Sequence, residues 1–100
     1  MTSKKRKQFH KELADVLAHI EDPGVMTSYL SDLLTPVEFD ELAIRLQIIK
    51  RLLDGMPQRQ IAEELGVGIA TVTRGSRELK ERNNGFARVL LHGSNKNKTV

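Results

Sequence analysis

The chain has 100 residues, a formal net charge of +3 and a hydrophobic content of 39%, which suits one small folded domain. It contains no cysteine, which excludes a disulfide framework and a thiolate metal site. No apolar run approaches the roughly 20 residues of a membrane-spanning helix. The basic N-terminus leads into no apolar signal core, so we expect a cytoplasmic protein without membrane contact.

Apolar residues recur at helical spacing throughout the chain, and no alternating strand pattern is present. We therefore predict an all-α fold of six helices, the first at roughly residues 5–21. Asp22 and Pro23 follow it, and they predict the start of a second helix because aspartate can cap a helix and proline is tolerated in its first turn.

The third predicted helix is the longest and the most apolar. Thr35 and Glu38 have the spacing of a capping box and predict its start, and Gly55 follows its end. Its apolar residues form two stripes, Leu42, Leu46, Ile49 and Leu53 in one and Ile44, Ile48 and Leu52 in the other. Because both sides of this helix are apolar, both need cover. A second copy of the chain or the first two helices could supply it; we favour a homodimer.

Arg45 falls between the two apolar stripes of that helix. A long cation in apolar surroundings needs a partner, since an unpaired buried charge is costly. The partner is either a carboxylate such as Glu41, in a simple salt bridge, or a ligand whose site Arg45 lines. Periodicity leaves both open.

The segment 59–80 has the pattern of a helix-turn-helix, the two-helix unit that places one helix in the DNA major groove. Ala62 is small where two helices would cross, Gly66 stands where the chain must turn, and Val72 would point back between the helices. We predict this unit at about residues 57–81. One domain is expected over residues 1–92, with a short sixth helix at 86–90 and a disordered tail at 93–100.

The last helix of this unit has two polar faces besides its inward one. The first is the candidate DNA face, because its small and hydroxyl side chains suit base edges and its N-terminus suits phosphate. The predicted DNA-contacting residues are Gln58, Arg59, Gly68, Ile69, Ala70, Thr71, Thr73, Arg77 and Lys80. A merely solvated polar face is the alternative. On the second face Arg74 and Glu78 either bridge each other or point toward Arg45 and Thr35.

A basic cluster at the N-terminus, Lys4 to Lys7, either adds nonspecific DNA affinity or is a solvated, disordered arm. No enzyme is expected, because the sequence shows no nucleophile–base constellation and no phosphate-binding glycine loop. His10, His19 and His92 are dispersed without metal-ligand spacing, so no catalytic or metal-binding residue is predicted.

The runs Leu34-Thr35-Pro36, Ala43-Ile44-Arg45-Leu46 and especially Gly68 to Ser76, GIATVTRGS, resemble the bacterial tryptophan repressor family. The resemblance covers roughly residues 30–82. It implies an all-helical, intertwined homodimer that represses transcription at a palindromic operator. It also implies L-tryptophan as corepressor, with no other cofactor, wedged between the core and the reading head.

Carried over by matching positions, the resemblance places the arginines that flank the ligand's indole at Arg45 and Arg74. The carboxylate contacts fall on Arg74 and Thr35, and Thr71 and Gly75 line the same pocket. The family serine that helps to hold the ligand's ammonium aligns with Glu78, whose carboxylate either holds an ammonium or pairs with Arg74. The segment Gly55 to Pro57 is one residue shorter than in the family pattern.

Three functional hypotheses follow from these residues. The first is a homodimeric repressor controlled by L-tryptophan. The second keeps DNA binding but takes a different small-molecule effector, or none. The third is a helical protein–protein interaction module whose helix-turn-helix has lost DNA binding.

Overall fold

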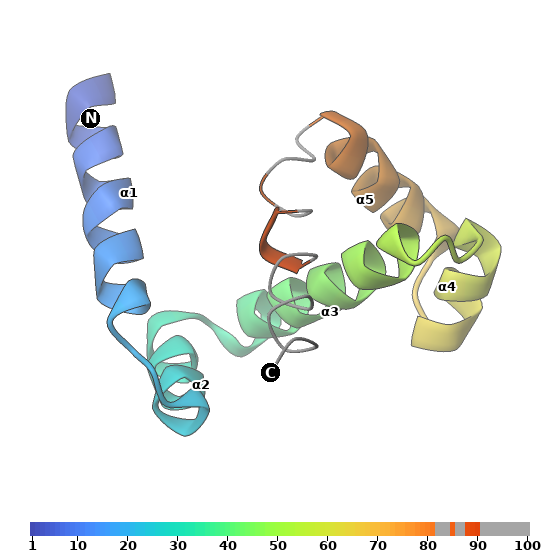
Figure 1. Ribbon diagram of the computed structural model, residues 1–100, viewed down its shortest axis with the longest axis horizontal. Helices are drawn as coiled ribbons and strands as arrows, with labels where there is room; N and C mark the ends of the chain where they lie inside the picture. The colour runs from blue at the N-terminus through green and yellow to red at the C-terminus, as the bar shows by residue number, and fades with distance from the viewer. Residues whose placement is uncertain (82–84, 86–87, 91–100) are drawn as a thin grey trace. The chain divides into compact units, whose positions relative to one another are not determined.

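The computed structural model describes residues 1–81, 85 and 88–90. Five α-helices and no strand are assigned among these residues: α1 (Ser3–Ala18), α2 (Pro23–Leu33), α3 (Pro36–Leu53), α4 (Gln58–Leu65) and α5 (Ile69–Glu81) (Figure 1). The predicted all-α class and the first five helices are confirmed, although α1 begins and ends earlier than expected. The predicted sixth helix lies only partly within the described residues, and the predicted tail lies outside them.

The chain divides into two compact units, Met1–Phe39 and Asp40–Val100. The expectation of a single domain over residues 1–92 stays a prediction.

Local capping explains where the helices of the first unit begin. The Asp22 Oδ2 atom accepts a hydrogen bond from the Val25 N–H at 2.9 Å, directly before Pro23. Thr35 and Glu38 form the reciprocal capping box, with the Glu38 N–H donating to Thr35 Oγ1 at 3.2 Å and the Thr35 N–H donating to Glu38 Oε1 at 2.9 Å. These bonds to Thr35, its backbone N–H first, hold the pKa of the Glu38 carboxyl below its ordinary value.

Neither α1 nor α2 buries a residue fully, so the first unit has no core of its own in the single chain. The apolar stripe of α1 remains largely in solvent, with Phe9 51%, Leu13 42% and Val16 43% exposed. Lys4 to Lys7 stand in the first two turns of α1 rather than in a coiled arm. The cluster is therefore solvated, as the solvated-arm alternative expected, but it is helical and not disordered, and its contribution to DNA affinity stays a prediction.

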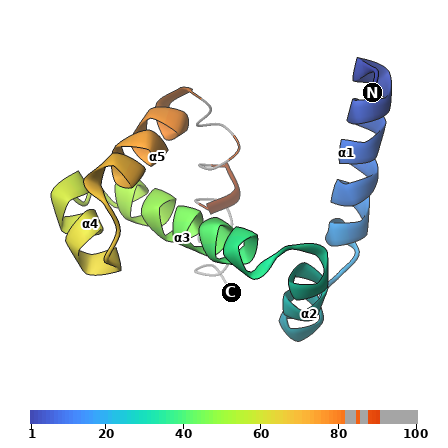
Figure 2. The ribbon, with the colours of Figure 1, turned by 180° about the vertical axis from the view of Figure 1, so that it is seen from behind.

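The core of the second unit comes from three helices. Ile48 of α3, Ile61 and Ala62 of α4 and Val72 of α5 form one buried cluster, in which Ile61 and Val72 are 0% exposed. Both ribbon views show α4 and α5 beside the C-terminal half of α3 (Figures 1 and 2). The turn between α4 and α5 depends on Gly66, whose φ of 68° is the left-handed conformation that glycine tolerates.

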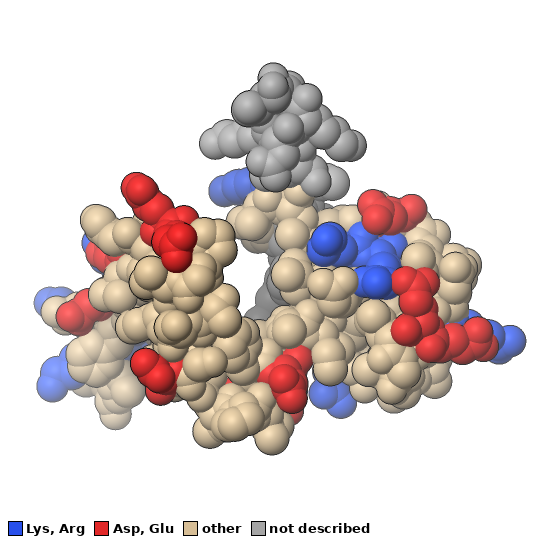
Figure 3. Space-filling model, turned by 90° about the horizontal axis from the view of Figure 1, so that it is seen from below, with Lys and Arg blue, Asp and Glu red and all other residues tan. Residues whose placement is uncertain are grey.

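Burial along α3 changes from one end to the other. Ile48 and Ile49, near its C-terminal end, are 2% and 1% exposed, whereas Leu42 and Leu46 remain 43% and 44% exposed. The prediction of two apolar sides is confirmed, and part of that apolar surface has no cover in the single chain. Figure 3 shows that uncharged side chains make up much of the visible surface. No described helix combines the length and apolarity of a membrane span.

Candidate functional site

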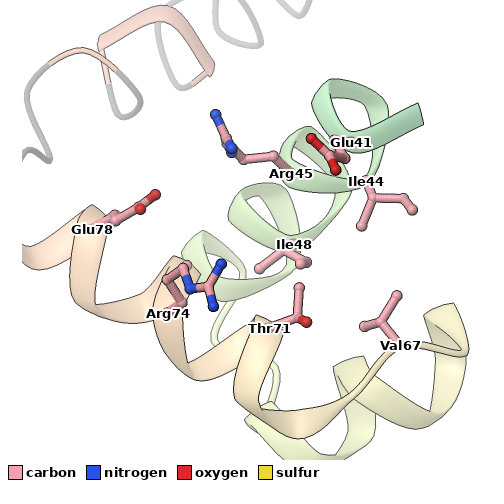
Figure 4. A pocket seen from close by; sticks show the side chains of 9 residues that line it. Glu41, Ile44, Arg45, Ile48, Val67, Thr71, Arg74 and Glu78 are labelled. Atoms are coloured by element: carbon pink, nitrogen blue, oxygen red, sulfur yellow. The ribbon is translucent and has the colours of Figure 1, made fainter. Parts of the chain in front are cut away.

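A cavity of about 370 Å³ lies between α3 and α5. The α3 side contributes Glu41, Ile44, Arg45 and Ile48, and the α5 side contributes Thr71, Arg74, Gly75 and Glu78, with Val67 from the turn before α5 (Figure 4). This volume falls in the usual range for small-molecule sites. The cavity therefore combines an apolar wall with two guanidinium and two carboxylate groups.

The register of α5 explains how one helix serves both the core and the cavity. Thr71, Arg74, Gly75 and Glu78 recur at three- and four-residue steps, so they share one flank of the helix. Val72 and Ser76 lie on the inward side and are buried. The second polar face predicted for this helix is thus the face that lines the cavity.

Gly75 allows α5 to approach α3 closely. A Cβ atom at this position would lie 2.9 Å from the Cγ2 atom of Ile48, closer than carbon atoms normally pack. Gly75 and Ile48 also both line the cavity. The absence of a side chain at residue 75 therefore sets both the helix spacing and the shape of the cavity wall.

The charged residues of the cavity do not bridge one another. Among the described residues the ion pairs are Lys11–Asp15 and Arg51–Glu64, and neither involves a cavity residue. The two bridges that the sequence left open, Arg45 to Glu41 and Arg74 to Glu78, are therefore not formed in this part of the chain. Figure 4 shows both arginines and Glu78 extending into the space between α3 and α5.

The structure thus places five of the six predicted ligand residues at one cavity, namely Arg45, Thr71, Arg74, Gly75 and Glu78. Thr35 belongs to the other unit, where its hydroxyl serves the capping box of α3. A role of Thr35 in ligand binding, like the roles of the other five, stays a prediction.

Four residues of the cavity were not predicted as site residues: Glu41, Ile44, Ile48 and Val67. The sequence did hold a signal for three of them. Glu41 and Arg45 are four residues apart, as are Ile44 and Ile48, so each pair shares a face of α3. Val67 gave no such signal, because its position depends on the turn that follows Gly66.

Of the predicted DNA-contacting residues Thr71 lines the cavity, and the others lie on α4, on α5 or in the turn between them without lining it. All of them are exposed except Gln58, which is half-buried, and even the apolar Ile69 is 51% exposed. The Thr73 hydroxyl donates to Gln58 Oε1 at 2.8 Å, so it links the starts of the two helices. The Gly68 carbonyl accepts from the Thr71 N–H at 3.1 Å in the first turn of α5.

Within the part of the chain that the structure describes, no group of three or more His, Cys, Asp or Glu side chains is arranged to hold a metal ion. The side chains that line the cavity can form ion pairs, hydrogen bonds and apolar contacts.

Comparison with known proteins identifies the family to which this small helical chain belongs. The family model described as "Trp repressor protein" matches residues 8–93. A "Trp operon repressor homolog" of Vibrio vulnificus (strain YJ016) is 39% identical over 90 residues, which cover 86% of this chain and 88% of that protein.

Two further relatives carry the same name. The homolog of Vibrio parahaemolyticus is 53% identical over 73 residues, covering 72% of this chain and 71% of that protein. The homolog of Vibrio cholerae is 56% identical over 54 residues, covering 53% and 52%. The chain belongs to the Trp repressor family and is a transcriptional regulator of that family. The predicted family is thereby confirmed.

Proposed function

We propose that this chain is a DNA-binding repressor that acts as a homodimer and is controlled by L-tryptophan. In this proposal α4 and α5 form the helix-turn-helix, and α5 is the helix that reads the major groove. The support is its family membership and the name of its relatives, Trp operon repressor homolog, together with the arrangement of α5.

The observation that carries the proposal is that one flank of α5 lines the cavity while another flank is exposed. One flank, with Arg74 and Glu78, lines the cavity against α3. The other, with Ala70, Thr73 and Arg77, is exposed and faces away from the core. A ligand in the cavity would contact α5 on a different flank from the one that reads DNA, so it would favour one position of α5 over others. A ligand that binds the DNA-competent position better shifts the population toward it.

The composition of the cavity fits an amino acid with a large apolar side chain. Ile44, Ile48 and Val67 supply an apolar wall, and the guanidinium groups of Arg45 and Arg74 stand at its edge. A guanidinium can stack on an aromatic plane and can also bind a carboxylate. Both interactions suit the indole and the carboxylate of L-tryptophan.

The homodimer is supported by apolar surface that the single chain leaves exposed. Leu42 and Leu46 of α3 and the stripe Phe9, Leu13 and Val16 of α1 are each more than two-fifths exposed. A chain of 100 residues with few fully buried side chains is marginal alone, whereas a second copy would cover these faces. Two reading helices related by a two-fold axis would then match a palindromic operator.

The direct test is to select duplexes from a random pool with the full chain and L-tryptophan, and then to measure affinity by fluorescence anisotropy. We expect a palindromic site, tighter binding with L-tryptophan, and an affinity that falls steeply with salt. Equal binding with and without L-tryptophan would favour a DNA-binding regulator with another effector or none. Failure to bind any duplex at low salt would favour a protein–protein interaction module.

A further inference from the structure

One arginine joins the last turn of α3 to the last turn of α4. The Arg51 Nε atom donates to Glu64 Oε1 at 3.0 Å, and the two side chains form an ion pair. The Nη1 atom of Arg51 donates to Gln47 Oε1 at 2.6 Å and to the Gln47 carbonyl at 3.2 Å. The guanidinium is thus held by its own helix while it binds the next one. Because the Arg51 side chain is only 22% exposed, solvent screens this pair less than a pair at the open surface.

The backbone of Arg51 also takes part in the turn that follows α3. Its carbonyl accepts a hydrogen bond from the Met56 N–H at 3.0 Å, and the Leu52 carbonyl accepts one from the Gly55 N–H at 3.0 Å. With Gly55 at a φ of 84°, these bonds form a Schellman helix end. Pro57 then begins α4 without a side-chain capping hydrogen bond. Arg51 therefore contacts the segment before α4 through its carbonyl and the last turn of α4 through its guanidinium.

The location of Glu64 in its helix indicates that its partner on α3 matters. Glu63 and Glu64 both lie in the last turn of α4, which contains no basic residue. A carboxylate is unfavourable there because the unpaired carbonyls give this end of a helix a partial negative charge. The ion pair with Arg51 offsets that cost for Glu64, whereas Glu63 forms no ion pair among the described residues. The two neighbouring glutamates thus differ in their link to α3.

This ion pair lies on a different flank of α3 from the cavity. Arg45, Ile48 and Arg51 follow one another at steps of three residues, and each step turns about 60° around the helix. Arg45 and Ile48 line the cavity, Ile48 also packs in the core, and Arg51 lines no part of the cavity. The contact of α3 with the two-helix unit α4–α5 therefore has the cavity at one side and the ion pair at the other.

We propose that Arg51 is a positioning residue for DNA binding: by binding Glu64 it holds α4, and with it α5, in the orientation that the duplex requires. Neither residue needs to touch DNA for this role. The inference rests on the proposed DNA binding and adds the side chain that orients the reading helices. The pair can favour one orientation by no more than its own strength, which corresponds to about threefold to fivefold in affinity for a partly exposed ion pair.

The test measures affinity for the selected duplex by fluorescence anisotropy, with the full chain at a fixed L-tryptophan concentration. Glu64→Gln makes the chain more positive by one charge, and Arg51→Met makes it less positive by one. Attraction to phosphate alone predicts tighter duplex binding by the first variant and weaker binding by the second. The positioning role predicts that both variants bind about threefold to fivefold more weakly.

Two further variants separate the ion pair from charge in general. Glu63→Gln is the matched control, the same charge change in the same turn of α4 without loss of an ion pair, and should bind the duplex at least as tightly as the unsubstituted chain. In the double variant of Arg51→Met and Glu64→Gln the two losses should not add, because both remove one interaction. Thermal unfolding of each variant gives a temperature at which all are folded, so that a loss of fold is not taken for a loss of affinity.

The outcomes separate this inference from the proposed function. If Glu64→Gln binds the duplex as tightly as the unsubstituted chain or more tightly, or if Glu63→Gln loses affinity equally, Arg51 has no positioning role, although DNA binding stands. Additive losses in the double variant would overturn the inference in the same way. If the unsubstituted chain binds no duplex, the proposed function is wrong, and this inference with it.

Discussion

The close approach of α5 to α3 at Gly75 gives the sharpest prediction about stability. A Cβ atom at residue 75 would lie 2.9 Å from Ile48 Cγ2, whereas carbon atoms normally pack at about 3.5–4.0 Å. Ile48 is 2% exposed and branched at Cβ, so its methyl group cannot swing into solvent. Gly75→Ala must therefore move α5 away from α3.

The expected magnitude is the difference of two effects. Overpacking in a filled core costs about 1–3 kcal/mol, and replacing a glycine inside a helix by alanine stabilises it by about 1 kcal/mol. We expect the overpacking to win, with a net loss of about 1 kcal/mol in the free energy of unfolding. Because Gly75 also lines the cavity, the variant should bind L-tryptophan more weakly.

The assay is urea unfolding followed by circular dichroism, with all variants at the same chain concentration because dimerisation would shift the midpoint. In a double-mutant cycle, Ile48→Ala removes the contacting methyl, so in that background Gly75→Ala should be neutral or stabilising. Ile48→Val keeps that methyl and is the control in which the loss should persist. A Gly75→Ala variant as stable as the unsubstituted chain, or an equal loss in the Ile48→Ala background, would refute the steric argument.

Four other predictions concern the DNA surface, the ligand and the cap of α3. Thr73→Val removes the hydroxyl that orients Gln58 and should weaken duplex binding about fivefold to tenfold. Thr73→Ser keeps a hydroxyl and should bind the duplex as tightly as the unsubstituted chain. An equal loss of affinity in both variants would contradict this role of the hydroxyl. Arg74→Ala should keep the helical content, since the side chain is exposed, yet DNA binding should no longer respond to L-tryptophan; a normal response would count against the assignment. Thr35→Ala should lower the free energy of unfolding by about 1 kcal/mol through loss of the cap. The pKa of Glu38 is lowered in the folded chain, so the stability that its carboxylate contributes is fully present above the ordinary pKa of 4.5 and is lost as the pH falls through the folded pKa. The difference in the free energy of unfolding between Glu38→Gln and the unsubstituted chain should therefore be smallest in acid. A difference that does not change with pH would contradict the capping role.

The local features of the fold could be read from the sequence because their causes are local. Asp22 before Pro23, the Thr35–Glu38 box and Gly66 each act within a few residues, and each has the predicted geometry. Helical spacing also separated Val72 from Arg74 on α5, assigning Val72 to the core and Arg74 to a second polar face, which in the structure lines the cavity.

The cavity as a whole could not be predicted, because it depends on which flank of α3 meets α5. Periodicity gave α3 two equivalent apolar stripes, and only the packing of Ile48 against Gly75 shows which one faces the cavity. Glu41 was therefore weighed only as a partner for Arg45, although both residues line the same wall. The hydrogen bond between Thr73 and Gln58 was likewise beyond the sequence, since it joins two helices across a turn.

The central claim, that a ligand between α3 and α5 controls DNA binding by the same helix, is tested most directly by measuring L-tryptophan affinity with and without the selected duplex. Because the chain contains no Trp, the fluorescence of the bound ligand reports its own binding. Coupling between two sites is reciprocal, so the duplex should tighten L-tryptophan binding by the same factor by which L-tryptophan tightens duplex binding. An L-tryptophan affinity that the duplex leaves unchanged would contradict the account.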